Sequence, residues 1–244
     1  KSISTTNYAI TYIPELAQTT DQQRNNYLAE AYFLRAFCYF NLVRIWSDVP
    51  LVVEPTLTLE EVEKPTQSPQ QKVLEQIKLD LEKAIELTNF TGVKSDVHFF
   101  NPAALYCLYA HYAMWTHDYE TAEKYTAQVL TMGYTLVNGI NFATVCSNGT
   151  TSENIWTLKW LFENNGKNNA MYKMNGRNAP QLIPSKAIRE AWQLGEYIDD
   201  LRGEQTLNKA LVYGTSHVTD FPKGAAIWKW EPGVGVAETN EKYI

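Results

Sequence analysis

An unbroken helical pattern runs from Asn25 to Trp46, and it restricts the fold more than any other feature of the sequence. Side chains recur there at spacings of three and four, which places them in one continuous stripe on a single long helix. The Ser-Asp pair at 47–48 and the Val-Pro pair at 49–50 end this helix, because a residue before proline is pushed out of the helical region. The stripe consists of Leu28, Ala31, Tyr32, Arg35, Cys38, Tyr39 and Leu42.

Three later segments also predict helices. The segment 68–87 opens with Ser68 as a candidate N-cap, a proline at the first helical position and Gln71 as the partner in a capping box. An Asn-Pro pair begins the segment 101–115 in the same way, and the segment 119–133 ends at a glycine.

The segments 101–115 and 119–133 have the spacing of a tetratricopeptide-like hairpin. Tyr106 and Tyr109 stand where such a repeat has large residues, and Ala122 is the small residue that lets the two helices approach. We therefore expect an array of helical hairpins as the scaffold of residues 20–133.

The chain changes character after this hairpin. Short strand-like runs at 134–137 and 155–160 lie among loops rich in Asn, Gly, Ser and Thr, and a short helix is expected at 185–192. The predicted fold is mainly α: a tetratricopeptide-like helical scaffold over residues 1–135, and an irregular, loop-rich region with short strands over residues 136–244.

The charge of the sequence argues against binding to nucleic acid, and its hydropathy argues against a membrane-spanning helix. The 21 basic and 27 acidic side chains give a net charge of −6, whereas a protein that binds nucleic acid normally has a basic face. No apolar run approaches the roughly 20 residues of a membrane-spanning helix.

Neither metal nor redox chemistry is indicated. The cysteines Cys38, Cys107 and Cys146 form no CxxC pair, so neither a disulfide framework nor a zinc site is expected. His111 and His117 are six positions apart, which is a poor spacing for metal ligands. The sequence therefore predicts no metal ligand and no cofactor.

Catalytic patterns are equally weak. The adjacent carboxylates at 60–61 and 199–200 are not the opposed pair, about 5–10 Å apart, that glycoside hydrolysis requires. No G-x-S-x-G and no phosphate-binding loop occurs. We expect no catalytic residue, and hence no enzyme.

The segment 29–52 resembles the signature helix of the SusD/RagB family. Residues 29–44 (A-E-A-Y-F-L-R-A-F-C-Y-F-N-L-V-R) lead into W-S-D-V-P-L-V at 46–52. Residues 77–85 resemble the family's I-x-x-D-L-x-x-A helix, and the family's V-L-x-x-G-Y pattern matches 129–134. The motifs at 152–156 (S-E-N-I-W) and 199–202 (D-D-L-R) follow in the expected order, so the similarity spans most of residues 25–202.

This resemblance implies a function. Family members are glycan-binding lipoproteins on the outer face of the Gram-negative outer membrane, and each works with a SusC-like TonB-dependent transporter. The chain is then expected to bind an oligosaccharide without catalysis and to deliver it for uptake, with a membrane association only through a lipid anchor that these residues lack. Members are longer, so the chain resembles a core without its N-terminal lipidated segment and C-terminal helical pair. They also usually have Gly where Ser47 stands.

The candidate ligand-binding residues come from physical chemistry, because the family binds its ligands through variable loops outside the shared motifs. Aromatic residues make up 13% of the chain, and exposed rings beside amide and guanidinium donors suit sugars. The alternative for these rings is packing in the core, which we also expect for Tyr32, Tyr39 and Trp46, and Arg35 is expected in a structural ion pair or carbonyl contact. The candidates are Trp160, Tyr172, Asn175, Arg177, Trp228 and Trp230.

Two other functions stay open from the sequence. A tetratricopeptide-type adaptor would hold a peptide in a groove along the inner helices of 101–130. A carbohydrate-active enzyme would need two carboxylates that face each other across a pocket.

Overall fold

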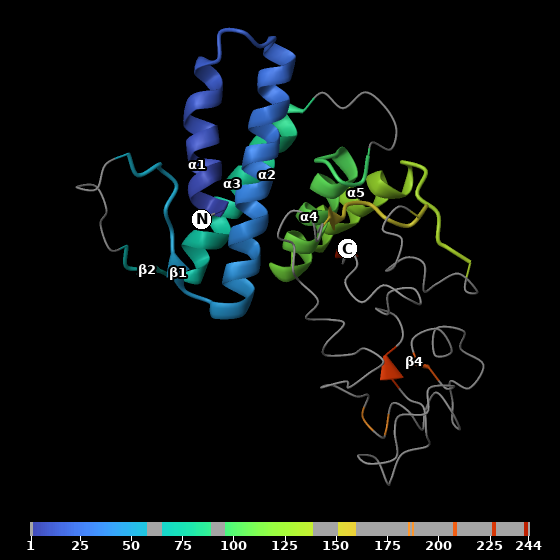
Figure 1. Cartoon of the computed structure of the whole chain (residues 1–244). Coiled ribbons are helices and arrows are strands. Elements are labelled where there is room, and N and C mark those ends of the chain that lie inside the picture. Colours follow the sequence, from blue (N-terminus) through green and yellow to red (C-terminus); the bar gives the residue numbers. More distant parts are fainter. Residues whose placement is uncertain are drawn as a thin grey trace. The chain divides into compact units, whose positions relative to one another are not determined.

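A computed structural model of the chain describes residues 2–57, 65–88, 96–138 and 151–159, together with residues 185 and 187 and three later two-residue strands. This described part is mainly helical, as the sequence predicts, and contains five α-helices, one 3-10 turn and six two-residue strands (Figure 1). The helices are α1 (Ser2–Tyr12), α2 (Asp21–Trp46), α3 (Gln70–Leu87), α4 (Pro102–Trp115) and α5 (Tyr119–Leu130), with the 3-10 turn η1 at Ile13–Glu15. The strands are β1 (Val49–Pro50), β2 (Gln67–Ser68), β3 (Leu158–Lys159), β4 (Leu207–Asn208), β5 (Ala226–Ile227) and β6 (Lys242–Tyr243), paired as β1–β2, β3–β6 and β4–β5.

The chain divides into two compact units. The first, here called the helical unit, consists of Lys1–Ser95 and Phe100–Gly133 and contains all five helices. The second unit consists of Asp96–Phe99 and Tyr134–Ile244.

Helix α2 is the central element of the helical unit. It packs against both α1 and α3 and also contacts α4 (Figure 1). Its first turn is closed by a capping box, in which Thr20 accepts from the Gln23 backbone N–H and the Gln23 side chain accepts from the Thr20 N–H.

The most deeply buried stripe of α2 differs from the predicted one. Its members alternate at spacings of four and three, and each is at most 2% exposed. The predicted stripe forms one flank of this surface: Ala31, Arg35 and Tyr39 are buried and its other members are half-buried. A helix with neighbours on several sides buries more than one face, so a single-face pattern underestimates its core. The deepest stripe consists of Ala29, Phe33, Ala36, Phe40 and Val43.

Helix α1 was not expected from the sequence. Its residues show weak helical periodicity, and its buried positions are the polar Thr6 and Asn7. The helix is held by polar contacts, since Thr6 donates to the Ile3 carbonyl at 2.8 Å and Asn7 contacts residues 45 and 47 positions further along the chain. Polar contacts of this kind produce no apolar periodicity, so the pattern of apolar residues in the sequence does not predict this helix.

Helix α3 begins two residues later than its predicted cap. Ser68 lies in β2, opposite Val49, and the N-cap position belongs to Pro69, so the predicted Ser68–Gln71 capping box is wrong. The Asp48 carboxylate accepts from the Gln70 backbone N–H at 2.8 Å instead. The cap comes from the turn after α2, which local spacing cannot reveal.

The helices predicted at 101–115 and 119–133 are present as α4 and α5, and they pack against each other. Asn101 caps α4 by accepting from the Ala104 N–H at 2.9 Å, and Asp118 caps α5 by accepting from the Thr121 N–H at 3.2 Å. Ala122 is 4% exposed, as expected for the small residue between the helices.

Aromatic rings fill the space between α4 and α5. Tyr125 stacks on Tyr109 with ring centroids 4.6 Å apart and on Tyr106 with centroids 5.5 Å apart, both at an interplanar angle of 20°. Tyr112 meets Tyr109 nearly edge-on at 6.0 Å. These rings pack the hairpin itself.

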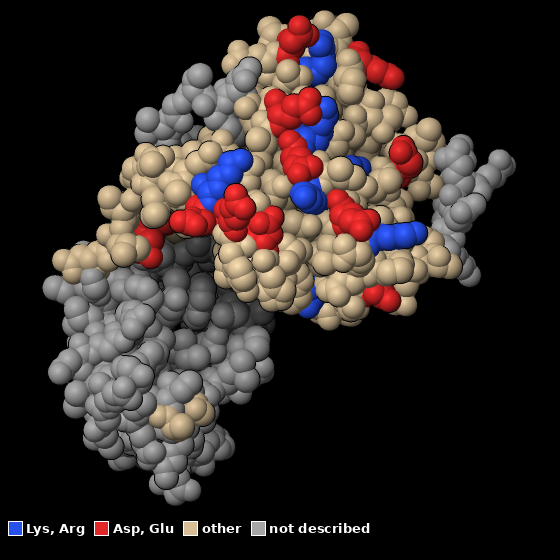
Figure 2. Space-filling model, turned by 180° about the vertical axis from the view of Figure 1, so that it is seen from behind, with Lys and Arg blue, Asp and Glu red and all other residues tan. Residues whose placement is uncertain are grey.

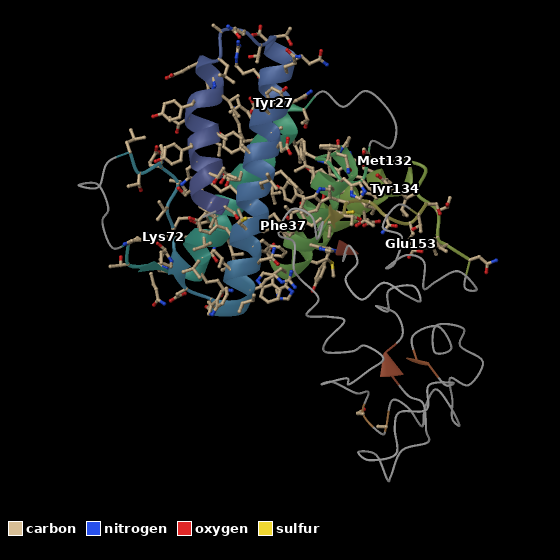
Figure 3. The ribbon with its side chains drawn as sticks, in the orientation of Figure 1. Tyr27, Phe37, Lys72, Met132, Tyr134 and Glu153 are labelled. Carbon is tan, nitrogen blue, oxygen red and sulfur yellow. The ribbon has the colours of Figure 1, made fainter. Side chains whose placement is uncertain are left out.

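In the second unit, residues 134–137 form no strand, contrary to the sequence prediction, but they are paired with the S-E-N motif. Thr135 donates its N–H to the Ser152 carbonyl at 3.3 Å, and the Ser152 hydroxyl donates to the Thr135 carbonyl at 2.9 Å. The Glu153 carboxylate accepts from the Val137 N–H at 3.0 Å (Figure 3). The predicted helix at 185–192 lies almost entirely outside the described residues.

Candidate functional site

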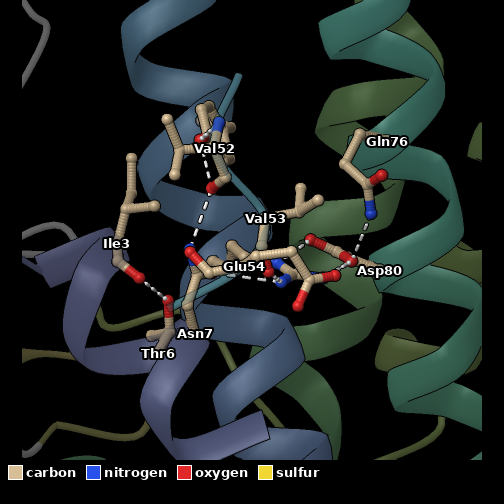
Figure 4. Close-up of polar contacts among 10 residues, drawn as sticks. Ile3, Thr6, Asn7, Val52, Val53, Glu54, Gln76 and Asp80 are labelled. Atoms are coloured by element: carbon tan, nitrogen blue, oxygen red, sulfur yellow. Dashed lines mark hydrogen bonds and ion pairs between the residues drawn. The ribbon is translucent and has the colours of Figure 1, made fainter. Parts of the chain in front are cut away.

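A buried polar cluster joins the two strongest sequence motifs. Arg35 on α2 donates through Nε and Nη2 to the two carboxylate oxygens of Asp80 on α3, at 2.8 and 2.7 Å (Figure 4). Its Nη1 donates to Asn7 Oδ1 at 3.1 Å and to the Val53 carbonyl at 3.0 Å. Arg35 is 4% exposed, and Asn7 and Asp80 are 1% exposed each. We call these three residues the polar clamp.

The polar clamp and Tyr39 hold the backbone that follows α2 and β1. The Tyr39 hydroxyl accepts from the Val52 N–H at 2.7 Å and donates to the Val52 carbonyl at 2.9 Å. Asn7 Nδ2 donates to the carbonyls of Val52 and Glu54 at 2.9 and 3.2 Å. Side chains therefore satisfy backbone groups that a neighbouring strand would otherwise pair.

The clamp is structural. Burial by itself lowers the pKa of Arg35, but the hydrogen bond and the charge of Asp80 outweigh burial and raise that pKa above its ordinary value. For the Tyr39 hydroxyl, whose charged form is an anion, burial has the opposite effect and raises the pKa. Arg35 thus remains a cation engaged by Asp80, Asn7 and a backbone carbonyl, which confirms the interpretation of this residue as part of an ion pair and a carbonyl contact.

The six candidate ligand-binding residues all lie outside the described residues. The structure therefore gives no geometry for them, and their role stays a prediction. They are Trp160, Tyr172, Asn175, Arg177, Trp228 and Trp230.

One predicted core ring of α2 is at the surface. Trp46 is 61% exposed, so its assignment to the core is wrong, whereas Tyr39 is 1% exposed as expected. Tyr32 is half-buried and lies over the Arg35 guanidinium, with 5.5 Å between Cζ and the ring centroid. Trp46 is the last residue of α2.

Another arginine of α2, Arg44, lies over one buried ring and one exposed ring. The Arg44 Cζ is 5.1 Å from the Phe40 ring centroid and 5.9 Å from that of Trp115 on α4. Phe40 is buried and Trp115 is 44% exposed. This contact was not predicted from the sequence, although Phe40 and Arg44 are four positions apart on one helix face.

The other charges of the helical unit are mixed in sign. On α3, Lys83 contacts Glu86 at 2.9 Å and Lys78 contacts Glu82 at 3.9 Å. Basic and acidic side chains alternate over the described part of the face in Figure 2, so this face carries no broad field of one sign.

The hairpin tyrosines are poor candidates for acid–base chemistry. Burial, the nearby Glu82 carboxylate and the Tyr125 ring raise the pKa of Tyr109 far above its ordinary value, and Tyr109 lies 3.2 Å from a Glu82 oxygen as a hydrogen-bond donor. Burial likewise raises the pKa of Tyr112 and of Tyr125. These phenols keep their protons at neutral pH.

Reactive and metal-binding groups are sparse in the part that the structure describes. The thiols of Cys38 and Cys107 are free, and burial raises the pKa of each. Among the described residues, no three His, Cys, Asp or Glu side chains lie close enough together to hold a metal ion. In the same residues, no helix is both long and apolar enough to span a membrane.

Comparison with known proteins identifies a family model and several proteins that this chain resembles. Residues 1–114 match the family model described as "Starch-binding associating with outer membrane". The SusD-like protein P38 of Formosa agariphila is 33% identical over 180 residues, which cover 73% of this chain and 31% of that protein. The SusD-like protein P2 of the same organism is 34% identical over 84 residues, or 34% of this chain and 16% of that protein. The chain thus spans about a third of the length of P38.

Solved structures share the fold. A laminarin-binding SusD-like protein superposes with a TM-score of 0.76 over 98% of this chain and 60% of that chain, at 22% sequence identity. A SusD superfamily protein from Bacteroides fragilis superposes with a TM-score of 0.56 over 66% of this chain and 35% of that chain, at 25% identity. The family model covers the α1–α4 region that contains the polar clamp. Residues 1–114 therefore belong to the SusD-like family by their match to its model, and the identity to P38 extends this similarity over 73% of the chain.

Proposed function

We propose that this chain is the glycan-binding, non-catalytic component of an outer-membrane nutrient-uptake system. It would capture an oligosaccharide at the cell surface, where a lipid anchor holds the full-length protein, and deliver it to a SusC-like TonB-dependent transporter. The observation that carries the proposal is the match of residues 1–114 to a family described as starch-binding and associated with the outer membrane. A laminarin-binding protein with the same fold supports a glycan as the ligand.

In this proposal, the two parts of the chain have different tasks. Residues 1–135 form a helical scaffold stiffened by the polar clamp, and residues 136–244 carry the ligand-binding surface. The division follows the change from helical periodicity to runs rich in Asn, Gly, Ser and Thr near residue 135.

The proposed contacts are stacking and hydrogen bonding. Rings at Trp160, Tyr172, Trp228 and Trp230 would lie against the C–H faces of pyranoses, and Asn175 and Arg177 would donate to the hydroxyls around the sugar edge. No bond of the sugar is made or broken, so the ligand leaves unchanged.

A binding experiment tests this function. We expect the parent chain to bind at least one glycan on an array and in calorimetry, with laminarin oligosaccharides as the first probe. Trp160→Ala and Tyr172→Ala should each weaken that binding by about fivefold, since ring stacking contributes on the order of 1 kcal/mol. Trp46→Ala is the matched control, because it removes an exposed ring of the helical unit. Unchanged affinity in both site variants would show that the site assignment is wrong.

A further inference from the structure

The Arg44 guanidinium rests in an aromatic corner between two helices. Phe40, one turn earlier on α2, meets Trp115 of α4 edge-on, with ring centroids 6.5 Å apart and an interplanar angle of 87°. Arg44 lies 5.1 Å from the first ring and 5.9 Å from the second. The Phe40 ring is held in place by its neighbours, because Phe40 is 2% exposed and its ring centroid also lies 6.3 Å from that of Tyr112.

The hydrogen-bonding edge of this guanidinium is available. Contact with a ring face uses no N–H donor, so a guanidinium that lies over rings keeps its donors for a further partner. Arg44 is exposed and makes no hydrogen bond or ion pair with another residue that the structure describes. Arg24 and Arg35, by contrast, are paired with Asp21 and Asp80.

Such a group is preorganised for one planar anion. Two rings already limit the rotamers of Arg44, so less side-chain entropy is lost when its fork binds a carboxylate through two parallel bonds. The Trp115 ring centroid lies 5.9 Å from Arg44 Cζ, and Trp115 is 44% exposed, so its ring offers an apolar surface near Arg44 to the molecule that carries the carboxylate. The net charge of −6 disfavours a densely charged polyanion and leaves a local contact with a single carboxylate.

We propose that Arg44 and Trp115 form a second glycan-contact surface, which binds the carboxylate of a uronic acid residue while the indole packs against the sugar ring. This inference rests on the proposed function, because it takes the ligand to be a glycan. It adds a ligand class, acidic sugars, and a location on the α2–α4 helices that is separate from the candidate residues after position 159.

The test compares two trisaccharides on the intact chain. Trigalacturonate is the acidic probe and laminaritriose is the neutral one, and both are titrated by calorimetry or by NMR. Arg44→Gln and Trp115→Ala should each weaken trigalacturonate binding about tenfold and leave laminaritriose binding unchanged. Arg44→Lys keeps the charge but loses the planar fork, so its affinity should fall between those of the parent and Arg44→Gln.

Lys72→Gln is the matched control, since it removes one exposed positive charge from the helical unit (Figure 3). Equal effects of Lys72→Gln and Arg44→Gln would show a general charge effect and overturn the inference, as would a parent chain that does not bind trigalacturonate. Thermal unfolding checks that each variant is folded, and the Lys variant preserves the test if Arg44→Gln is unstable. Trigalacturonate binding that persists in Trp160→Ala, with no neutral glycan bound by the parent, would contradict the proposed loop site and support this surface.

Discussion

Arg35 and Asp80 are joined by two parallel hydrogen bonds although they stand 45 positions apart in the sequence. Their side chains are only 5% and 2% exposed. The pair connects the long signature helix to the I-x-x-D-L helix, and through Asn7 it also fastens α1. Two motifs that look independent in the sequence are thus halves of one contact.

Breaking this pair should be costly. Arg35→Met or Asp80→Leu leaves the partner charge buried, so we expect each to lower the free energy of unfolding by about 3–5 kcal/mol. The double variant Arg35→Met/Asp80→Leu should be more stable than either single variant, because it leaves no unpaired charge. Urea unfolding followed by circular dichroism measures all three. A loss below 1 kcal/mol in both single variants would refute the structural role of the clamp.

The second prediction concerns Ser47, the residue that follows α2. Its φ of 61° lies in the left-handed region, and its backbone N–H donates to the Val43 carbonyl at 2.9 Å to close α2. Glycine adopts such a φ without the clash of a Cβ. Ser47→Gly should therefore stabilise the chain by about 0.5–1 kcal/mol and raise Tm by about 1–4 °C.

Ser47→Ala separates backbone strain from any effect of the hydroxyl, because it keeps the Cβ and removes the oxygen. We expect it to leave Tm within about 1 °C of the parent value or slightly lower it. A Tm that rises as much in Ser47→Ala as in Ser47→Gly would rule out strain as the cause.

The start of α3 gives a third prediction. The Asp48 carboxylate caps the Gln70 N–H, whereas Ser68 lies in a two-residue strand. Asp48→Ala should lower the free energy of unfolding by about 0.5–2 kcal/mol, and Ser68→Ala should change it by less than about 0.5 kcal/mol. Chemical denaturation of the two variants side by side distinguishes the distant cap from the local one. The reverse order would mean that Ser68 is the cap after all.

Glu30 on α2 should make stability depend on pH. Burial raises its pKa above the ordinary value of 4.5, so the folded chain holds this proton more tightly than the unfolded chain does. The free energy of unfolding therefore falls as the pH rises from about 4.5 through the raised pKa, and Glu30→Gln removes that fall. At pH 7 the Gln variant should be more stable by a few tenths of a kcal/mol, because water still screens this partly buried group.

Thermal unfolding between pH 4 and pH 7 checks this sign. The two melting curves should converge near pH 4 and separate toward neutral pH, with the Gln variant higher. A Gln variant that is less stable at pH 7 would show that the ionised carboxylate is favourable in the folded chain.

The sequence predicted local features best. The end of α2 before Val49-Pro50 and the cap at Asn101 depend on neighbouring residues only, and the structure has both of them. The central position of α2 was not predictable in this way. A helix with several neighbours buries apolar residues on more than one side, so Phe33 and Phe40 fall outside a single-face stripe.

Long-range polar contacts explain most of the remaining differences. The sequence showed that Arg35 needs a partner, but nothing near it identified Asp80 or Asn7, because these partners come from other helices. The same holds for Asp48 as the cap of α3. For the candidate ligand site, residue types alone supported the prediction, since rings and amides show what a loop can bind and not where each side chain lies.

The proposed function requires that the chain bind a glycan and leave it intact. Calorimetric titration of the purified chain with the best glycan from an array, followed by chromatography of the recovered sugar, measures both properties. We expect saturable binding that Trp160→Ala and Tyr172→Ala weaken, and a recovered sugar of unchanged length. Shortened sugar products, or the absence of binding to every glycan on the array, would contradict the proposed function.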